Sequence, residues 1–179
     1  DKLKDSMGGA DTILEIDNKS LTHRPDLWCH FGFAREIAAI LGQKLKENPD
    51  RFADDKEEGL ALLKALGSGE AKVKPVIADN TPCRRFLSVE FADVKAAPSP
   101  LWMRRRLHSV GAGVRNILVD LSNYVMHDLG QPNHAYDADK IQGGVLEARY
   151  AKEGEVFLGL DGVQRVLTAK DMVIADGSG

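Results

Sequence analysis

Amide, imidazole and carboxylate side chains gather between residues 123 and 137 of this sequence, around a point where a helix cannot continue. Asn123 offers two donors and an acceptor, and His134 can donate or accept according to its tautomer. Pro132 fixes its own φ and lacks a backbone N–H, while Gly130 can adopt the left-handed conformation that ends a helix. We therefore expect a shaped loop whose polar side chains could bind a hydroxyl group or orient a water molecule.

The same residue types also have a purely structural interpretation, which residue chemistry alone favours. Asn123 can bond nearby backbone at a helix start, and His134 can bond a loop carbonyl. A metal site is disfavoured, because a metal needs three or four convergent ligands and the candidates match no familiar spacing. Those candidates are His127, Asp128, His134 and Asp137.

Two further motifs could bind a ligand but are more often structural. The basic run 104–106 could contact phosphate, although such a run is usually the solvated face of a helix whose apolar residues pack inward. Those apolar residues would be Trp102, Met103 and Leu107. Residues 22–26 (THRPD) place an Arg and an Asp beside a helix-initiating Pro, an arrangement that more often fixes a loop.

Composition narrows the class of protein. The 179 residues are 43% hydrophobic and 28% charged, which is typical of a globular protein with one well-packed domain. No run of eighteen apolar residues occurs, so no membrane span is expected. The formal charge of −3 argues against a free-standing nucleic-acid binder and leaves room for a weak or tethered RNA contact. Cys29 and Cys83 form no CxxC pair, which predicts reduced thiols and a cytoplasmic protein.

The elements expected from periodicity and turn chemistry indicate an α+β fold with mixed or antiparallel sheets and inserted short helices. A strand, a loop and a helix are expected within residues 1–42, a charged linker over 43–72, and the main module over 73–179. The expected strands cover 12–16, 73–78, 86–94, 117–121, 144–150, 155–160, 163–167 and 172–175. The expected helices run from Pro25 to Leu41, from Ser99 and Pro100 to Gly111, and from Asn123 to Leu129 with Ser122 as the N-cap, with a weak helical patch over 60–66.

Several stretches, in order along the chain, resemble the β subunit of bacterial-type phenylalanyl-tRNA synthetases. Residues 14–28 (LEIDNKSLTHRPDLW) and 32–38 (GFAREIA) look like the stretch before that family's editing module. Five further stretches look like the module itself, namely 98–102 (PSPLW), 119–124 (VDLSNY), 130–137 (GQPNHAYD), 160–162 (LDG) and 173–176 (VIAD). Only the linker lies outside the resemblance.

The resemblance implies an editing role, in which the module hydrolyses tyrosine wrongly attached to the phenylalanine tRNA. His134 then matches the histidine associated with the tyrosine hydroxyl, and Asn123 matches an asparagine of the same pocket. The family's glycine and arginine of this region fall on Gly113 and Arg115. A glutamate of the family site is expected beyond Gly179, so we expect a fragment that is weak or inactive alone.

The resemblance also implies partners for the whole enzyme. These are tRNA(Phe) carrying tyrosine or phenylalanine, and the synthetase α subunit in a heterotetramer. ATP and magnesium are implied for the whole synthetase, whereas no cofactor is expected in this piece. The alternative is a non-catalytic module of the same subunit that serves structure, tRNA binding or subunit contact.

Overall fold

The computed structural model describes residues 12–46, 61, 64–66 and 69–178. It divides into two compact units, each built from two stretches of sequence. Unit 1 combines 1–50 with 94–135, and unit 2 combines 51–93 with 136–179. The expected division into 1–42, 43–72 and 73–179 stays a prediction. Most of the 60–66 patch lies outside the described residues, although 61 and 64–66 are helical.

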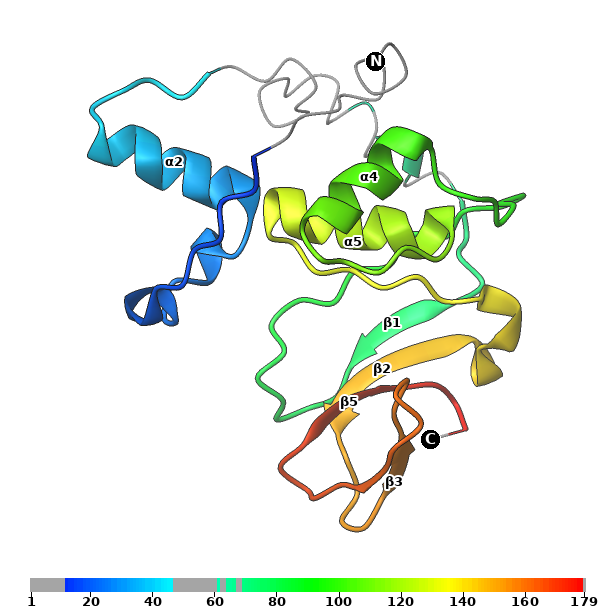
Figure 1. Ribbon diagram of the computed structural model, residues 1–179. Helices are drawn as coiled ribbons and strands as arrows, with labels where there is room; N and C mark the ends of the chain where they lie inside the picture. Colours follow the sequence, from blue (N-terminus) through cyan, green and yellow to red (C-terminus); the bar gives the residue numbers. More distant parts are fainter. Residues whose placement is uncertain (1–11, 47–60, 62–63, 67–68, 179) are drawn as a thin grey trace. The chain divides into compact units, whose positions relative to one another are not determined.

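Unit 1 is helical (Figure 1). Two short 3-10 helices, η1 (Lys19–Leu21) and η2 (Pro25–Leu27), precede α2 (His30–Ile40). The second stretch contributes α4 (Leu101–Ser109) and α5 (Ile117–Leu129), and α5 packs against both α2 and α4. The buried apolar side chains of this unit are Leu27, Cys29, Met103 and Leu107.

Unit 2 contains two small sheets. In the first, β1 (Lys74–Ile77) pairs in parallel with β2 (Val145–Tyr150), which pairs antiparallel with β5 (Met172–Ala175). The second is a hairpin of β3 (Val156–Leu158) and β4 (Gln164–Val166). Short 3-10 helices η3 (Ala138–Lys140) and η4 (Gln142–Gly144) lead into β2. The buried apolar side chains here are Val73, Leu146, Ala148, Ala151 and Ala175.

The predicted α+β class with mixed sheets is confirmed, as are the strands of both sheets. Each of the predicted strands 73–78, 144–150, 155–160, 163–167 and 172–175 contains an observed one. The hairpin turn is closed as expected, with Gly162 at φ 75° and its N–H donating to the Gly159 carbonyl. Among the described residues, no helix is long and apolar enough to cross a membrane.

Three predicted strands are wrong. Residues 12–16 and 86–94 have no regular structure, because their apolar patterns pair with no neighbouring strand in the described part of the chain. Residues 117–121 form the first turns of α5 instead, because the Asn116 side chain caps that helix. The side chain of Ser122, expected to be the cap, donates to the Leu118 carbonyl from within the helix.

The first predicted helix is broken rather than continuous. Pro25 begins only η2, and α2 starts after Cys29, whose Sγ accepts the Gly32 N–H at 3.2 Å. A Cβ on Gly32 would lie 1.6 Å from the Asp26 carbonyl oxygen, so only glycine allows the two segments to pack this closely. Leu27 of the expected apolar face is buried, whereas Ile37 and Leu41 are exposed.

Candidate functional site

Helix α5 carries Asn123 and is defined at both ends by specific residues. At its start, Asn116 Oδ1 accepts the N–H groups of Leu118 and Val119 at 3.0 and 3.2 Å. At its end, Gly130 adopts φ 73°, as predicted, and donates its N–H to the Met126 carbonyl. The helix therefore stops at Gly130, and the chain can reverse before Pro132.

The segment after Gly130 runs back along α5, as Figure 1 shows in yellow. Asn133 Nδ2 donates to the Ser122 carbonyl at 3.5 Å and to the Gln131 carbonyl at 3.3 Å. These contacts hold the residue before His134 against the residue before Asn123. Asn123 is half-buried on the helix, and His134 is exposed on the returning segment. That their side chains line one pocket stays a prediction.

The loop that carries Gly113 and Arg115 is held by a buried carboxylate. Asp120 is fully buried, and its Oδ1 accepts the backbone N–H of Arg115 at 2.8 Å. Its Oδ2 accepts the hydroxyl of Ser99 at 2.5 Å, so one side chain joins the residues before α4 to the loop before α5. Ser99 therefore bonds Asp120 and does not cap α4, whose N-cap is Pro100.

Arg115 and Gly113 are exposed in this loop. The residue that ends α4 with a positive φ is Gly111, at 74°, as the helix prediction stated. Gly113 lies two residues farther on, where an added Cβ would meet no atom within 4 Å. All four predicted site residues lie in unit 1. Their common role in a pocket stays a prediction.

Sequence reasoning missed Asp120 as a structural centre. The available signal was a single acidic residue in the middle of the apolar run 117–121, a position that requires specific partners. Taking the run as a strand obscured this signal. In the structure this run is the start of a helix, which directs the Asp120 carboxylate toward Ser99 and the Arg115 backbone.

An exposed aromatic and basic cluster covers part of α4 and α5. The rings of Trp102 and Tyr124 meet edge to face, with centroids 5.4 Å apart. The Arg106 guanidinium lies 5.5 Å from the Trp102 ring centroid and donates to the Tyr124 hydroxyl. Met103 and Leu107 are buried as predicted, but Trp102 is 52% exposed, so the prediction that it packs inward is wrong. We call Trp102, Arg106 and Tyr124 the α4 cluster.

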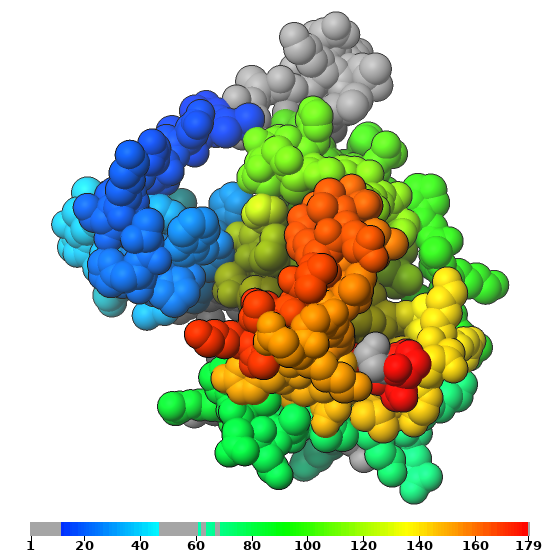
Figure 2. Space-filling model, turned by 90° about the horizontal axis from the view of Figure 1, so that it is seen from below, coloured from blue at the N-terminus to red at the C-terminus, as the bar shows by residue number. Residues whose placement is uncertain are grey.

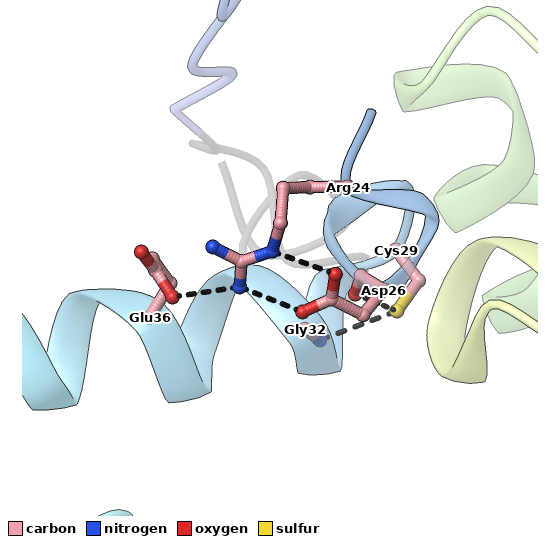
Figure 3. A network of polar contacts seen from close by, with 5 residues as sticks. All are labelled: Arg24, Asp26, Cys29, Gly32 and Glu36. Atoms are coloured by element: carbon pink, nitrogen blue, oxygen red, sulfur yellow. Dashed lines mark hydrogen bonds and ion pairs between the residues drawn. The ribbon is translucent and has the colours of Figure 1, made fainter. Parts of the chain in front are cut away.

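The 22–26 motif is a loop clamp, as its structural interpretation predicted (Figure 3). The Arg24 guanidinium donates to both carboxylate oxygens of Asp26, at 2.9 and 2.8 Å, and to Glu36 on α2 at 3.1 Å. These hydrogen bonds lower the pKa of Asp26 and raise that of Arg24. The side chains of Arg24 and Asp26 are thus used within the protein.

Metal ligation finds no support in the geometry. Across the described ranges, no group of three or more His, Cys, Asp and Glu side chains is arranged to hold a metal ion. Both cysteines are free thiols, Cys29 buried and Cys83 half-buried.

Comparison with known proteins gives a consistent result. The B3/4 domain family matches residues 82–179. Phenylalanine–tRNA ligase beta subunits of three bacteria are similar over nearly the whole chain. That of Solibacter usitatus is 43% identical over 169 residues, 94% of this chain and 20% of the relative. That of Geobacter sulfurreducens is 38% identical over 177 residues, which cover 98% of this chain and 20% of the relative. That of Porphyromonas gingivalis is 36% identical over 170 residues, which cover 95% of this chain and 20% of the relative. The chain thus spans about a fifth of these relatives' length.

Proposed function

The chain belongs to the B3/4 domain family, and we propose that it forms part of an editing site that hydrolyses tyrosine from mischarged tRNA(Phe). The proposal places the chain in a phenylalanine–tRNA ligase beta subunit, the protein to which its relatives belong. It also assigns the partners of that enzyme, namely tRNA(Phe) and the alpha subunit. ATP and magnesium would serve aminoacylation elsewhere in the whole enzyme.

The need for such a site follows from the chemistry of the two amino acids. Tyrosine differs from phenylalanine by one hydroxyl, and an apolar pocket rejects an added hydroxyl only about a hundredfold. A site that hydrogen-bonds the hydroxyl discriminates by roughly 10⁴ to 10⁵, because its polar groups are left unpaired when the hydroxyl is missing. A second site with polar side chains can therefore correct errors of the first.

The observation that supports this proposal is the return of the 131–135 segment along α5. The Asn133 to Ser122 hydrogen bond brings the stretch with His134 beside the turn with Asn123. An exposed imidazole and a half-buried amide on adjacent segments can approach one ligand from two sides. We assign the tyrosine hydroxyl to His134 and a second polar contact to Asn123.

The reaction needs a positioned water more than a strong base. Water attacks the ester carbonyl, the bond to the terminal ribose breaks, and the ribose oxygen takes up a proton, giving free tyrosine and uncharged tRNA. Asn123 can orient the water, and a ribose hydroxyl of the substrate can assist the proton transfer. We assign to Arg115, beside Gly113 in the loop held by Asp120, a contact with the phosphates of the tRNA end.

Deacylation of Tyr-tRNA(Phe) by the full beta-subunit enzyme carrying this sequence tests the proposal. His134→Ala should reduce Tyr-tRNA(Phe) hydrolysis about tenfold, as expected for the loss of a hydrogen bond to the substrate. His23→Ala removes another exposed imidazole, from the loop before Arg24, and should leave hydrolysis unchanged. Unchanged editing in His134→Ala would contradict the assignment and favour a non-catalytic module for structure, tRNA binding or subunit contact.

A further inference from the structure

Positive charge is concentrated around α4, although the chain as a whole is acidic. Residues 94–119 contain one Lys, four Arg and no Asp or Glu, whereas the formal charge of the chain is −3. The next carboxylate along the chain, Asp120, is fully buried and bonded to Ser99. It therefore does not neutralise the surface. The cationic residues are Lys95, Arg104, Arg105, Arg106 and Arg115.

The aromatic part of the same surface is exposed and held in place. Trp102 is 52% exposed, and Tyr124 fixes it by an edge-to-face contact. Arg106 lies over the Trp102 ring and is bonded to the Tyr124 hydroxyl, which uses one of its five N–H groups. A large indole surface thus lies in solvent beside guanidinium groups.

Exposed aromatic faces beside arginines are the chemistry that binds single-stranded nucleic acid. Bases stack on the aromatic ring, and arginines contact the phosphates on either side. We propose that the α4 cluster binds a single-stranded RNA segment, with one base stacked on Trp102 and a phosphate contacted by Arg106.

RNA fits this surface better than a protein partner does. An apolar protein partner would have to desolvate the Arg106 guanidinium beside the indole, whereas a polyanion gains from it. The inference rests on the proposed function in one respect, because the editing substrate ends in single-stranded RNA. Arg115 lies in the same basic stretch as α4, so a strand bound there would be guided toward the proposed pocket.

Binding of a short fluorescently labelled oligoadenylate to the full 179-residue chain, followed by anisotropy, tests the proposal. Trp102→Leu keeps an apolar side chain but removes the stacking surface, and should weaken binding about fivefold or more. Trp102→Phe keeps an aromatic face and should restore much of the affinity. Arg106→Gln should also weaken binding and reduce the salt slope by about 0.7.

Lys170→Gln is the matched control, because it removes the same charge from an exposed position outside α4. It should leave the affinity within error of the unsubstituted chain, and circular dichroism should show that every variant is folded. Equal loss in Lys170→Gln and Arg106→Gln would overturn the proposal in favour of a net-charge effect. Failure of the unsubstituted chain to bind RNA would also overturn it.

The two proposals can fail separately. RNA binding through Trp102 in a parent enzyme that does not hydrolyse Tyr-tRNA(Phe) would refute the editing role alone. Hydrolysis that is sensitive to His134, with RNA binding insensitive to Trp102 and Arg106, would refute the RNA surface alone.

Discussion

A buried carboxylate stabilises a fold only when both of its oxygens are paired, and Asp120 satisfies this condition through Ser99 and the Arg115 backbone. The first bond anchors the chain before α4, and the second anchors the loop before α5. Asp120 thus fixes the position of a candidate site residue without belonging to the pocket.

Asp120→Ala should lower the free energy of unfolding by about 3 kcal/mol, because it leaves a buried hydroxyl and a backbone N–H without an acceptor. Urea denaturation followed by tryptophan fluorescence measures this, since Trp28 and Trp102 both lie in unit 1. Ser99→Ala removes only one of the two bonds and should cost about 1 kcal/mol. Equal losses in the two variants would show that the Arg115 bond contributes nothing.

Gly32 gives a second prediction at the scale of one residue. Alanine normally stabilises a helix by about 1 kcal/mol relative to glycine, but at this position its Cβ would meet the Asp26 carbonyl at 1.6 Å. Gly32→Ala should therefore destabilise the chain by about 3 kcal/mol in the same urea assay. Gly69→Ala, at a site with no atom within 4 Å of the new Cβ, should change stability by less than about 0.5 kcal/mol.

At the scale of elements, β2 is tied to the turn before β3 by an ion pair. Arg149 donates two hydrogen bonds to Glu155, at 2.9 and 2.8 Å, and the Lys152 N–H donates a third. These hydrogen bonds lower the pKa of Glu155 from 4.5 to about 2, and the bonds from Arg149 contribute more than the bond from the Lys152 backbone. Because the folded state holds this proton more weakly than the unfolded chain, the carboxylate stabilises the fold above about pH 4.5 and ceases to do so as the pH approaches 2.

Glu155→Gln should therefore reduce stability at pH 7 and make no difference near pH 2. Thermal unfolding of both proteins across this range would show the difference in Tm closing between about pH 4.5 and 2. In an Arg149→Ala background the same substitution should have a much smaller effect. A Tm difference that stays constant with pH would contradict the role of the ion pair.

Elements specified by local chemistry were predicted, whereas the pairing of strands far apart in the sequence was not. The β3–β4 hairpin follows from alternating residues around Asp161 and Gly162, a signal contained within one short stretch. The parallel pairing of β1 with β2 joins residues far apart in sequence, which no local pattern encodes. Residues 86–94 have the composition of a strand, but composition alone supplies no pairing partner.

The candidate site was likewise predicted only in part. Gly130 and Pro132 predict that the helix ends before His134, and the structure confirms that it ends at Gly130. The helix that carries Asn123 begins six residues earlier than expected, because a short apolar run reads equally well as strand or helix. The exposure of Trp102 could not be predicted either, since an aromatic residue beside Met103 normally packs inward.

At the scale of the whole molecule, many large apolar side chains are exposed. In unit 2 they concentrate on the β3–β4 hairpin, whose residues appear in orange on the visible surface of Figure 2. Leu160 is 93% exposed, and Leu158 and Val166 are also exposed. Exposed apolar surface of this kind promotes association.

Leu160→Lys should reduce light scattering of concentrated solutions, because it places a charge at the most exposed part of this apolar surface. The free energy of unfolding should change by less than about 0.5 kcal/mol, since the side chain is in solvent. Leu107→Lys is the contrasting variant, because Leu107 is buried and its replacement should unfold unit 1. Unchanged scattering in Leu160→Lys would show that this surface does not drive association.

The parallel pairing of Lys74 with Val145 also sets an order for folding during translation. The ribosome releases β1 long before its partner, and at 5 to 20 residues per second the wait is roughly 4 to 14 seconds. During that interval the helices of 94–135 are completed, whereas the first sheet has only one of its three strands. Unit 1 can thus acquire its native structure first, and β1 is exposed to chaperones until β2 emerges.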